Sequence, residues 1–362
     1  MKHNQLKLIG GSLKGLAIPN VGRTEVPAEA NLLKVRGGIL VLSKSGANGL
    51  EWQQAVDTRD VLYDFTTHTF TNAGKTGNTG PTLAQCKTAY AAAKQWINNA
   101  DWFGVTATGI QIWTVPVTGY YRIRARGAGR LRLPGLNAAV TDTRPEADAV
   151  FKLFKGDKLR MAVGQLGLMA ANVGPVPSGS GGTFVQSSEQ GLLLVGGGAG
   201  GHGGSPSHVG VTTRTAGPCF SGYPLTEIKS TAPEGGAGIT RSSTEGNVSS
   251  QGYGGAGYSV SSARALSFLD GATGGTATDR YTHVAGFGCG GPASVNYNTS
   301  YSAYSVGGGG GYTGGDGASS RNQGARGGDG GCFIADFGED RKFNMEAVNT
   351  SRHGQVIVDL VG

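Results

Sequence analysis

The chain has 362 residues, a formal net charge of +7, 38% hydrophobic residues and 15% charged residues. The hydrophobic content exceeds that of a disordered chain, and no run of about 18 apolar residues occurs, so we expect no membrane insertion. Met1–Lys7 carries no apolar run, so we expect no signal peptide and synthesis in a cytoplasm. The positive charge favours acidic surfaces, but it is modest for this length, and we expect no nucleic-acid partner.

Residues 1–57 have the pattern of short strands and turns. Ile39–Leu42 is the clearest strand and lies between two glycines and the turn-like segment Ser45–Gly49. The segment contains too few apolar residues to build a core alone. We therefore expect it to associate with another copy of itself or with a larger assembly. The alternative is a flexible leader.

Residues 58–195 are predicted to form a β-sandwich that carries one helix, over residues 82–99. The helix begins with a capping box, in which Thr82 and Gln85 satisfy each other's backbone N–H groups. Apolar residues then recur every three or four positions and place Cys86 on the apolar face. A buried structural thiol is the interpretation that this position favours.

The strands of this sandwich are predicted from short apolar runs and from alternation of apolar and polar residues. Phe151–Val163 is predicted to be a hairpin with Lys155–Lys158 as its turn. The C-terminal strand, residues 354–361, is expected to close the sandwich. The other predicted strands are Val61–Phe70, Ile110–Val115, Tyr121–Arg126, Thr183–Val185 and Leu192–Val195.

Three arginines alternate with apolar residues in one of these strands. Successive side chains of a strand point to opposite faces, so Arg122, Arg124 and Arg126 are predicted to share one face. One interpretation is a cationic stripe for an anionic partner. The other is a solvated face, or a face packed across a subunit boundary.

The chain is organised around a glycine-rich block, residues 196–335, which contains more than half of the 66 glycines in separate clusters. A flexible Gly/Ser coil is one interpretation. The other is a bundle of short polyglycine II helices, which make no internal hydrogen bonds and must find partners on neighbouring segments. The clusters are short and separated, which favours repeated crossings of one compact block with loops between them.

Aromatic residues occur in the Ser-, Asn- and Thr-rich segments between these clusters. Tyrosine with serine, glycine and asparagine is the composition of adaptable binding loops. An equally weighted interpretation is that the rings cap and shield the glycine block. The candidate receptor-binding residues are Tyr297, Tyr301, Tyr304, Phe220, Tyr223 and Phe268.

The sequence shows no pattern typical of a catalytic or metal site. No P-loop, complete dinucleotide fingerprint or nucleophile elbow occurs, and we expect no enzymatic activity, cofactor or bound metal. The four cysteines, Cys86, Cys219, Cys289 and Cys332, are widely spaced. Two disulfides are one arrangement, but a reducing compartment favours mostly free, buried thiols.

Several segments resemble the glycine-rich domain of the anaplastic lymphoma kinase and leukocyte tyrosine kinase receptors, in the same order along the chain. They are Gly80–Tyr90, Gly109–Pro116, Tyr121–Gly129 and Gly307–Gly315. The resemblance implies a TNF-like or jelly-roll β-sandwich with an inserted bundle of polyglycine II helices, which serves as a ligand-binding module. The chain lacks the kinase and the transmembrane helix of those receptors, which removes receptor signalling from the expectation.

The N-terminal part resembles the attachment segments of bacteriophage tail fibres and other virion appendage proteins. The segments that carry this likeness are Glu25–Val35 and Ile39–Gln53. Glycine-rich adhesins at phage fibre tips are also similar. The resemblance implies a homotrimeric virion protein that residues 1–57 attach to other virion proteins, with loops of the glycine block binding a host-surface protein or polysaccharide. The alternative is a purely structural collar, decoration or baseplate subunit.

Overall fold

The fold is described from a computed structural model of the chain. It describes residues 8–9, 12–13, 32–35, 38–45, 49–54, 60–90, 95–131, 142–169, 176–201, 239–242, 249–279, 281–297, 302–320, 327–348 and 352–361. The chain divides into two compact units, Met1–Arg59 and Asp60–Gly362. The first boundary lies two residues beyond the end of the predicted segment 1–57.

Unit 1 contains two small antiparallel sheets. A two-stranded sheet pairs β1 (Leu8–Ile9) with β2 (Ser12–Leu13). A three-stranded sheet has the order β3–β4–β5, with β3 at Leu32–Val35, β4 at Gly38–Ser45 and β5 at Gly49–Gln54. The predicted strand Ile39–Leu42 lies within β4.

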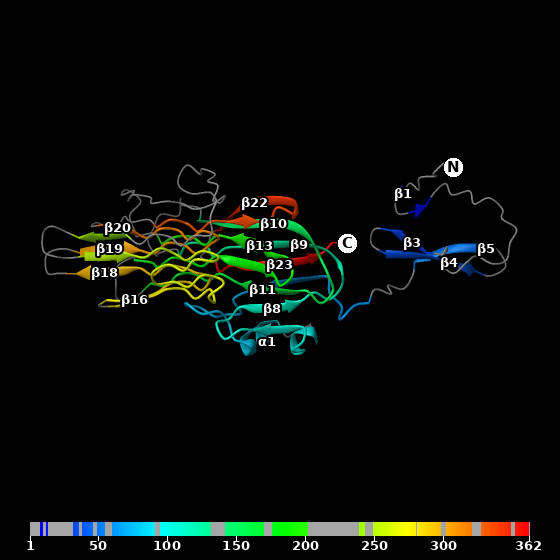
Figure 1. Cartoon of the computed structure of the whole chain (residues 1–362), viewed down its shortest axis with the longest axis horizontal. Coiled ribbons are helices and arrows are strands. Elements are labelled where there is room, and N and C mark those ends of the chain that lie inside the picture. The colour runs from blue at the N-terminus through cyan, green and yellow to red at the C-terminus, as the bar shows by residue number, and fades with distance from the viewer. Residues whose placement is uncertain are drawn as a thin grey trace. The chain divides into compact units, whose positions relative to one another are not determined.

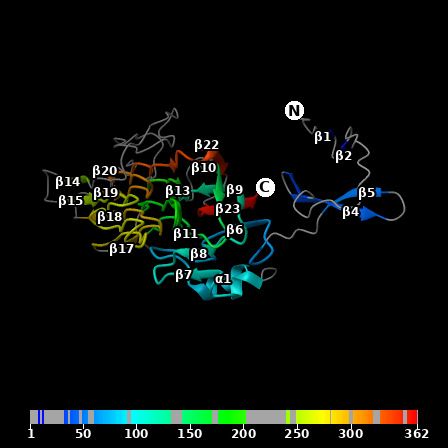
Figure 2. The same ribbon diagram turned by 45° about the vertical axis from the view of Figure 1, so that its right-hand side comes forward.

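Unit 2 is built on two antiparallel sheets (Figures 1 and 2). The five-stranded sheet has the order β22–β10–β9–β23–β6, and the six-stranded sheet has the order β21–β13–β12–β11–β8–β7. Their strands are β6 (Thr67–Phe70), β7 (Phe103–Val105), β8 (Gln111–Thr114), β9 (Gly119–Arg126), β10 (Asp142–Leu153), β11 (Lys158–Ala162), β12 (Thr183–Ser187), β13 (Gly191–Gly196), β21 (Phe333–Ile334), β22 (Glu339–Val348) and β23 (Gln355–Leu360).

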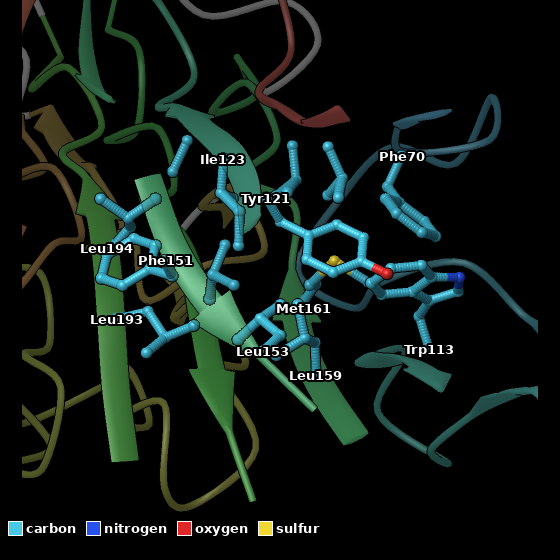
Figure 3. Close-up of a cluster of buried hydrophobic side chains, with 14 of the residues drawn as sticks. Phe70, Trp113, Tyr121, Ile123, Phe151, Leu153, Leu159, Met161, Leu193 and Leu194 are labelled. Atoms are coloured by element: carbon cyan, nitrogen blue, oxygen red, sulfur yellow. The ribbon is translucent and has the colours of Figure 1, made fainter. Parts of the chain in front are cut away.

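The two sheets enclose a common hydrophobic core (Figure 3). Tyr121 and Phe151 come from the five-stranded sheet, and Leu159, Met161 and Leu193 come from the six-stranded sheet; all are at most 1% exposed. The outer face of the six-stranded sheet is also covered, because the glycine-rich part of the chain packs against it. Ala162, Phe184 and Val195 of that face share a second core with Ala256, Phe268, Ala272, Phe287 and Cys289.

The C-terminal strand closes the sandwich as the sequence predicts. β23 lies inside the five-stranded sheet and pairs with β9 on one side and β6 on the other. The buried side chains of Tyr121, Ile123 and Ala125 alternate along β9 and face the core, and its arginines lie on the other face. The strand predicted over Val61–Phe70 is shorter, because only β6, its last four residues, joins the sheet.

The hairpin predicted for Phe151–Val163 is wrong. The turn is present, since Asp157 N–H donates to Phe154 O at 3.0 Å and Phe154 N–H donates to Asp157 Oδ2 at 3.0 Å. The strands that flank it do not pair with each other. β10 pairs with β9 and β22, whereas β11 pairs with β8 and β12 in the other sheet. The turn therefore crosses from one layer of the sandwich to the other.

Two helical elements lie within the predicted helix 82–99. α1 spans Leu83–Tyr90 and a 3₁₀ helix, η2, spans Gln95–Asn98. The capping box is confirmed, because Thr82 N–H donates to Gln85 Oε1 at 2.9 Å and Gln85 N–H donates to Thr82 Oγ1 at 3.2 Å. Cys86 is buried, as its position on the apolar face predicts.

The remaining described strands of unit 2 are short and lie between its glycine-rich segments. The strands are β14 (Ile239–Ser242), β15 (Ser249–Gly252), β16 (Thr276–Thr278), β17 (Thr282–Val284), β18 (Ser294–Tyr297), β19 (Ser302–Val306) and β20 (Ala318–Ser320). They form the hairpins β14–β15 and β16–β17 and the three-stranded sheet β18–β19–β20. None of the described helices is long and apolar enough to cross a membrane.

Candidate functional site

The glycine segments are joined to one another by backbone hydrogen bonds. The segment 307–311 is the clearest case: its N–H and C=O groups bond to residues on many segments, whereas a strand in a sheet has two neighbours. Its partners are Ser180, Gly198, Gly201, Tyr253, Ala256, Gly291, Gly315 and Gly328. These bonds satisfy the buried backbone without a sheet, so the segment lies inside a three-dimensional backbone lattice.

The lattice includes segments that the sequence analysis assigned to the sandwich. Gly181 N–H donates to Gln165 O at 2.8 Å, and Gly179 N–H donates to Gly291 O at 2.8 Å. A Cβ on Gly164 would lie 2.1 Å from Gly181 O, so these backbones also approach at glycine distance. The short glycine cluster at Gly179–Gly182 is the sequence feature from which these segments could have been assigned to the glycine-rich block.

The short strands β14, β15 and β18–β20 gather at the end of unit 2 away from the C terminus (Figures 1 and 2). Two of the candidate tyrosines lie in this group. The register pairs Tyr304 with Val295 and Tyr297 with Ser302. Positions two apart share a face of a strand, so Tyr297 and Tyr304 occupy positions on the same face of the sheet as Val295, which is buried. Tyr301, Phe220 and Tyr223 lie outside the described residues.

Phe268 is not a surface residue, which corrects its assignment as a receptor contact. It is 0% exposed and stacks between Phe184, with ring centroids 5.0 Å apart, and Tyr258, at 5.8 Å. Arg160 lies over its ring, with the guanidinium carbon 5.6 Å from the centroid. Phe268 therefore anchors its loop to the outer face of the six-stranded sheet.

The same loop exposes aliphatic residues that the sequence analysis did not select as candidates. Val260, Leu266 and Leu269 are 46%, 43% and 47% exposed. Single exposed aliphatics are common, but three within ten residues of one loop are a candidate contact surface. Aliphatics spaced through a Ser-rich segment are the signal that could have identified them.

Hydrogen bonds hold this loop in one shape. Ser261 Oγ and Ser267 Oγ both donate to Asp270 Oδ2 at 2.7 Å, and Leu269 N–H donates to Tyr258 O at 3.1 Å. The Ser267 hydroxyl, followed by that of Ser261, lowers the pKa of the Asp270 carboxyl. The exposed side chains are thus presented from a fixed backbone.

The three arginines of β9 share one face, but each is paired within the protein. Arg122 donates from Nε and Nη2 to the two carboxylate oxygens of Asp148, at 2.9 and 2.5 Å. Arg124 Nη2 donates to Asp359 Oδ2 at 2.7 Å, and Arg126 Nε donates to Glu146. The carboxylates neutralise the stripe, so this geometry favours a packed and solvated face over a site for an anionic partner.

Three of the four cysteines lie within the described residues. Cys86 and Cys289 are free and buried, and burial raises the pKa of Cys86 to about 12. Cys332 is disulfide-bonded, so the arrangement with a disulfide holds at this position. Within the described residues, no group of three or more His, Cys, Asp or Glu side chains is arranged to hold a metal ion.

His353 joins the sandwich to the lattice through its side chain and its backbone carbonyl. Its Nδ1 accepts Leu166 N–H at 3.1 Å, and its carbonyl accepts Arg144 Nη1 at 2.8 Å. Burial lowers the pKa of His353 below its ordinary value of 6.5. Burial also lowers the pKa of His283, although Asp279 opposes that shift.

We expect stability to fall as the pH drops below about 6.5. A histidine whose pKa is lowered on folding binds fewer protons when folded, so its contribution is complete above the unfolded pKa and is lost in acid. Unfolding midpoints measured from pH 8 to pH 5 test this. His353→Asn retains an acceptor near Nδ1 without titrating, so it should reduce the acid loss and leave the part due to His283. An unchanged pH slope in this variant would contradict the assignment.

No model of a known protein family matches the chain.

Proposed function

We propose that the chain is a phage virion protein, a tail-fibre tip adhesin that binds a host-surface receptor without catalysis. Residues 1–57 attach it to other virion proteins, and the protein acts as a homotrimer. Loops of the glycine-rich block bind the receptor, which is a protein or a polysaccharide.

The different features at the two ends of unit 2 are the main support for this proposal. Unit 1 joins it at Asp60, which pairs with Lys155 in the turn between β10 and β11. β9 begins at this end with Gly119 and runs to Arg126, beyond which Ala128 N–H donates to Gly181 O in the lattice at 3.1 Å. Asp60, the first residue of unit 2, therefore lies at the end of the sandwich opposite the glycine-rich block. An adhesin needs this separation between its attachment and binding ends.

We further propose that the lattice segments are polyglycine II helices inserted into a TNF-like sandwich. Partners on many sides of 307–311 support this, because a three-fold helix directs its N–H and C=O groups to several sides in turn. The close approach also supports it: a Cβ on Gly309 would lie 2.0 Å from Gly198 O. A flexible coil would require neither feature.

The receptor contact is assigned to two parts of the glycine-rich block: the strands at its free end, and the loop that Phe268 anchors to the outer face of the six-stranded sheet. Tyr297 and Tyr304 hold positions on one face of β18–β20, and the loop anchored by Phe268 presents fixed aliphatic side chains. A rigid scaffold that positions variable loops is a common arrangement of binding proteins. The alternative is a collar, decoration or baseplate subunit that never meets a receptor, and labelling the C terminus on intact particles separates the two by position.

Replacing Tyr297, Tyr301 and Tyr304 together with alanine is expected to lower adsorption to host cells at least tenfold. Aromatic side chains are enriched among the residues that dominate binding energy, and a tenfold change corresponds to about 1.4 kcal/mol. The measurement is the adsorption rate of particles that carry the variant. Tyr120→Ala is the matched control, because Tyr120 is exposed at the opposite end of the sandwich. Unchanged adsorption by the triple variant would remove the tyrosines from the site.

A further inference from the structure

The turn of the β16–β17 hairpin is joined to strand β18 by the carboxylate of Asp279 (Figure 1). Asp279 directly follows β16, and its Oδ1 accepts Tyr281 N–H at 2.7 Å, which closes the turn. Its Oδ2 accepts Val295 N–H of β18 at 2.6 Å. Because β18 is an edge strand of the sheet β18–β19–β20, this bond attaches the turn to the side of that sheet.

His283 lies beside this carboxylate and is buried without a hydrogen bond. It belongs to β17, pairs with Ala277 of β16 and is 0% exposed. Neither ring nitrogen has a hydrogen-bond partner among the described residues, and Nε2 lies 3.3 Å from Asp279 Oδ2. That oxygen already accepts Val295 N–H. The imidazole therefore sits next to a carboxylate whose two oxygens are both bonded to backbone N–H groups.

The buried position makes protonation of His283 unfavourable. Burial lowers the pKa of His283 below its ordinary value of 6.5, and Asp279, which favours the protonated ring, offsets only part of that shift. The other residues of β16 and β17 and the adjoining segment 165–169 contain no ionisable side chain. β18 contributes only Tyr297, a residue type that is neutral in acid. Arg280 lies outside the described residues.

We propose that His283 and Asp279 form an acid-sensitive joint, which opens between the β16–β17 hairpin and β18 when His283 takes up a proton. The imidazolium has two N–H donors, which gain partners from water or from Asp279 Oδ2. Water reaches the ring when the turn moves away from β18, and a bond to Oδ2 competes with Val295 N–H for the same oxygen. Both outcomes weaken the bond between the turn and the sheet.

The base of the hairpin stays in the lattice. Ala285 N–H donates to Gly275 O at 2.9 Å, and Leu168 N–H donates to Val284 O at 3.0 Å. The joint therefore frees the turn without unfolding unit 2. A histidine that is harder to protonate in the closed form stabilises that form fully above about pH 6.5, and this contribution is lost as the pH falls.

Amide hydrogen exchange of the full-length protein tests the joint. Mass spectrometry with fragmentation that resolves single amides is applied at pH 8 and pH 5, and each rate is corrected for the intrinsic effect of pH. We expect the corrected exchange of Val295 N–H to be about 3 to 30 times faster at pH 5. The upper limit is set by a histidine that titrates at 6.5 when the joint is open. Ala285 N–H should keep its protection.

Two variants identify the group that responds. His283→Leu cannot titrate, so the exchange of Val295 N–H should no longer depend on pH. His353→Asn replaces another buried histidine and should leave the dependence in place. A dependence that survives in His283→Leu, or one that disappears in His353→Asn, would overturn the assignment.

The natural protein alone also decides the question, because corrected exchange that is equal at pH 8 and pH 5 would refute the joint even if a variant failed to fold. Adsorption to cells plays no part in this measurement. Its result is therefore independent of the proposed receptor contact.

Discussion

Gly330→Ala is expected to destabilise unit 2 by about 3 kcal/mol or more, through the addition of one methyl group. A Cβ on Gly330 would lie 2.0 Å from Gly310 O and 2.4 Å from the carbonyl carbon of the same residue. Both atoms belong to a backbone, so no rotamer change relieves the overlap, and the segments must separate. Overpacking a close-packed interior costs about 1–3 kcal/mol even where side chains can adjust.

Separation of these segments also breaks hydrogen bonds. Gly330 N–H donates to Gly198 O at 2.8 Å, and the neighbouring Gly309 N–H donates to Gly328 O at 2.9 Å. Buried backbone groups that lose their partners cost about 1–3 kcal/mol each. Amide exchange in residues 307–311 and 327–331, together with urea unfolding, measures both effects.

Gly104→Ala is the matched control. Gly104 lies in β7, and a Cβ there would meet nothing within 4 Å. The substitution adds the same methyl group and restricts the unfolded chain to the same degree. We therefore expect the free energy of unfolding to change by no more than about 0.5 kcal/mol, or to rise slightly. Equal stability of the two variants would refute the lattice, and the polyglycine II proposal with it.

The main layers of the fold follow from local patterns in the sequence. Alternation in Tyr121–Arg126 predicts which side chains of β9 face the core, and the capping box predicts the start of α1. Glycine clusters predict close backbone approach, because only a residue without a Cβ permits it. Each of these features is determined by residues that are close together in the chain, so it can be predicted from the sequence alone.

The pairing of strands and the burial of loop residues depend on contacts with segments far away in the sequence. Local sequence patterns do not reveal these contacts. The turn at Lys155–Lys158 has the composition of a hairpin turn, yet its strands enter different sheets. Phe268 lies in a Ser-rich loop that predicts exposure, but Phe184 of β12 and Tyr258 enclose it. Similarly, the carboxylates that neutralise the arginines of β9 come from β10 and β23.

The second large effect is expected at a buried ion pair that fastens the lattice to the end of β9. Asp329 Oδ1 accepts Gly200 N–H at 2.8 Å and Arg130 Nη2 at 3.1 Å. Arg130 Nε also donates to Gly200 O at 3.1 Å. The side chains of Arg130 and Asp329 are 16% and 12% exposed, so little water can replace a missing partner.

Asp329→Ala should therefore cost about 3 kcal/mol of unfolding free energy, because it leaves a buried guanidinium and a buried amide without this acceptor. Asp336→Ala is the matched control: Asp336 pairs with Arg341 at 2.8 Å, but its side chain is fully exposed, so no measurable change is expected. Arg130→Ala combined with Asp329→Ala should cost less than the sum of the single changes, since the second removes a charge already unpaired. Additive losses, or equal stability of the Asp329 and Asp336 variants, would show that this pair does not hold the lattice to the sandwich.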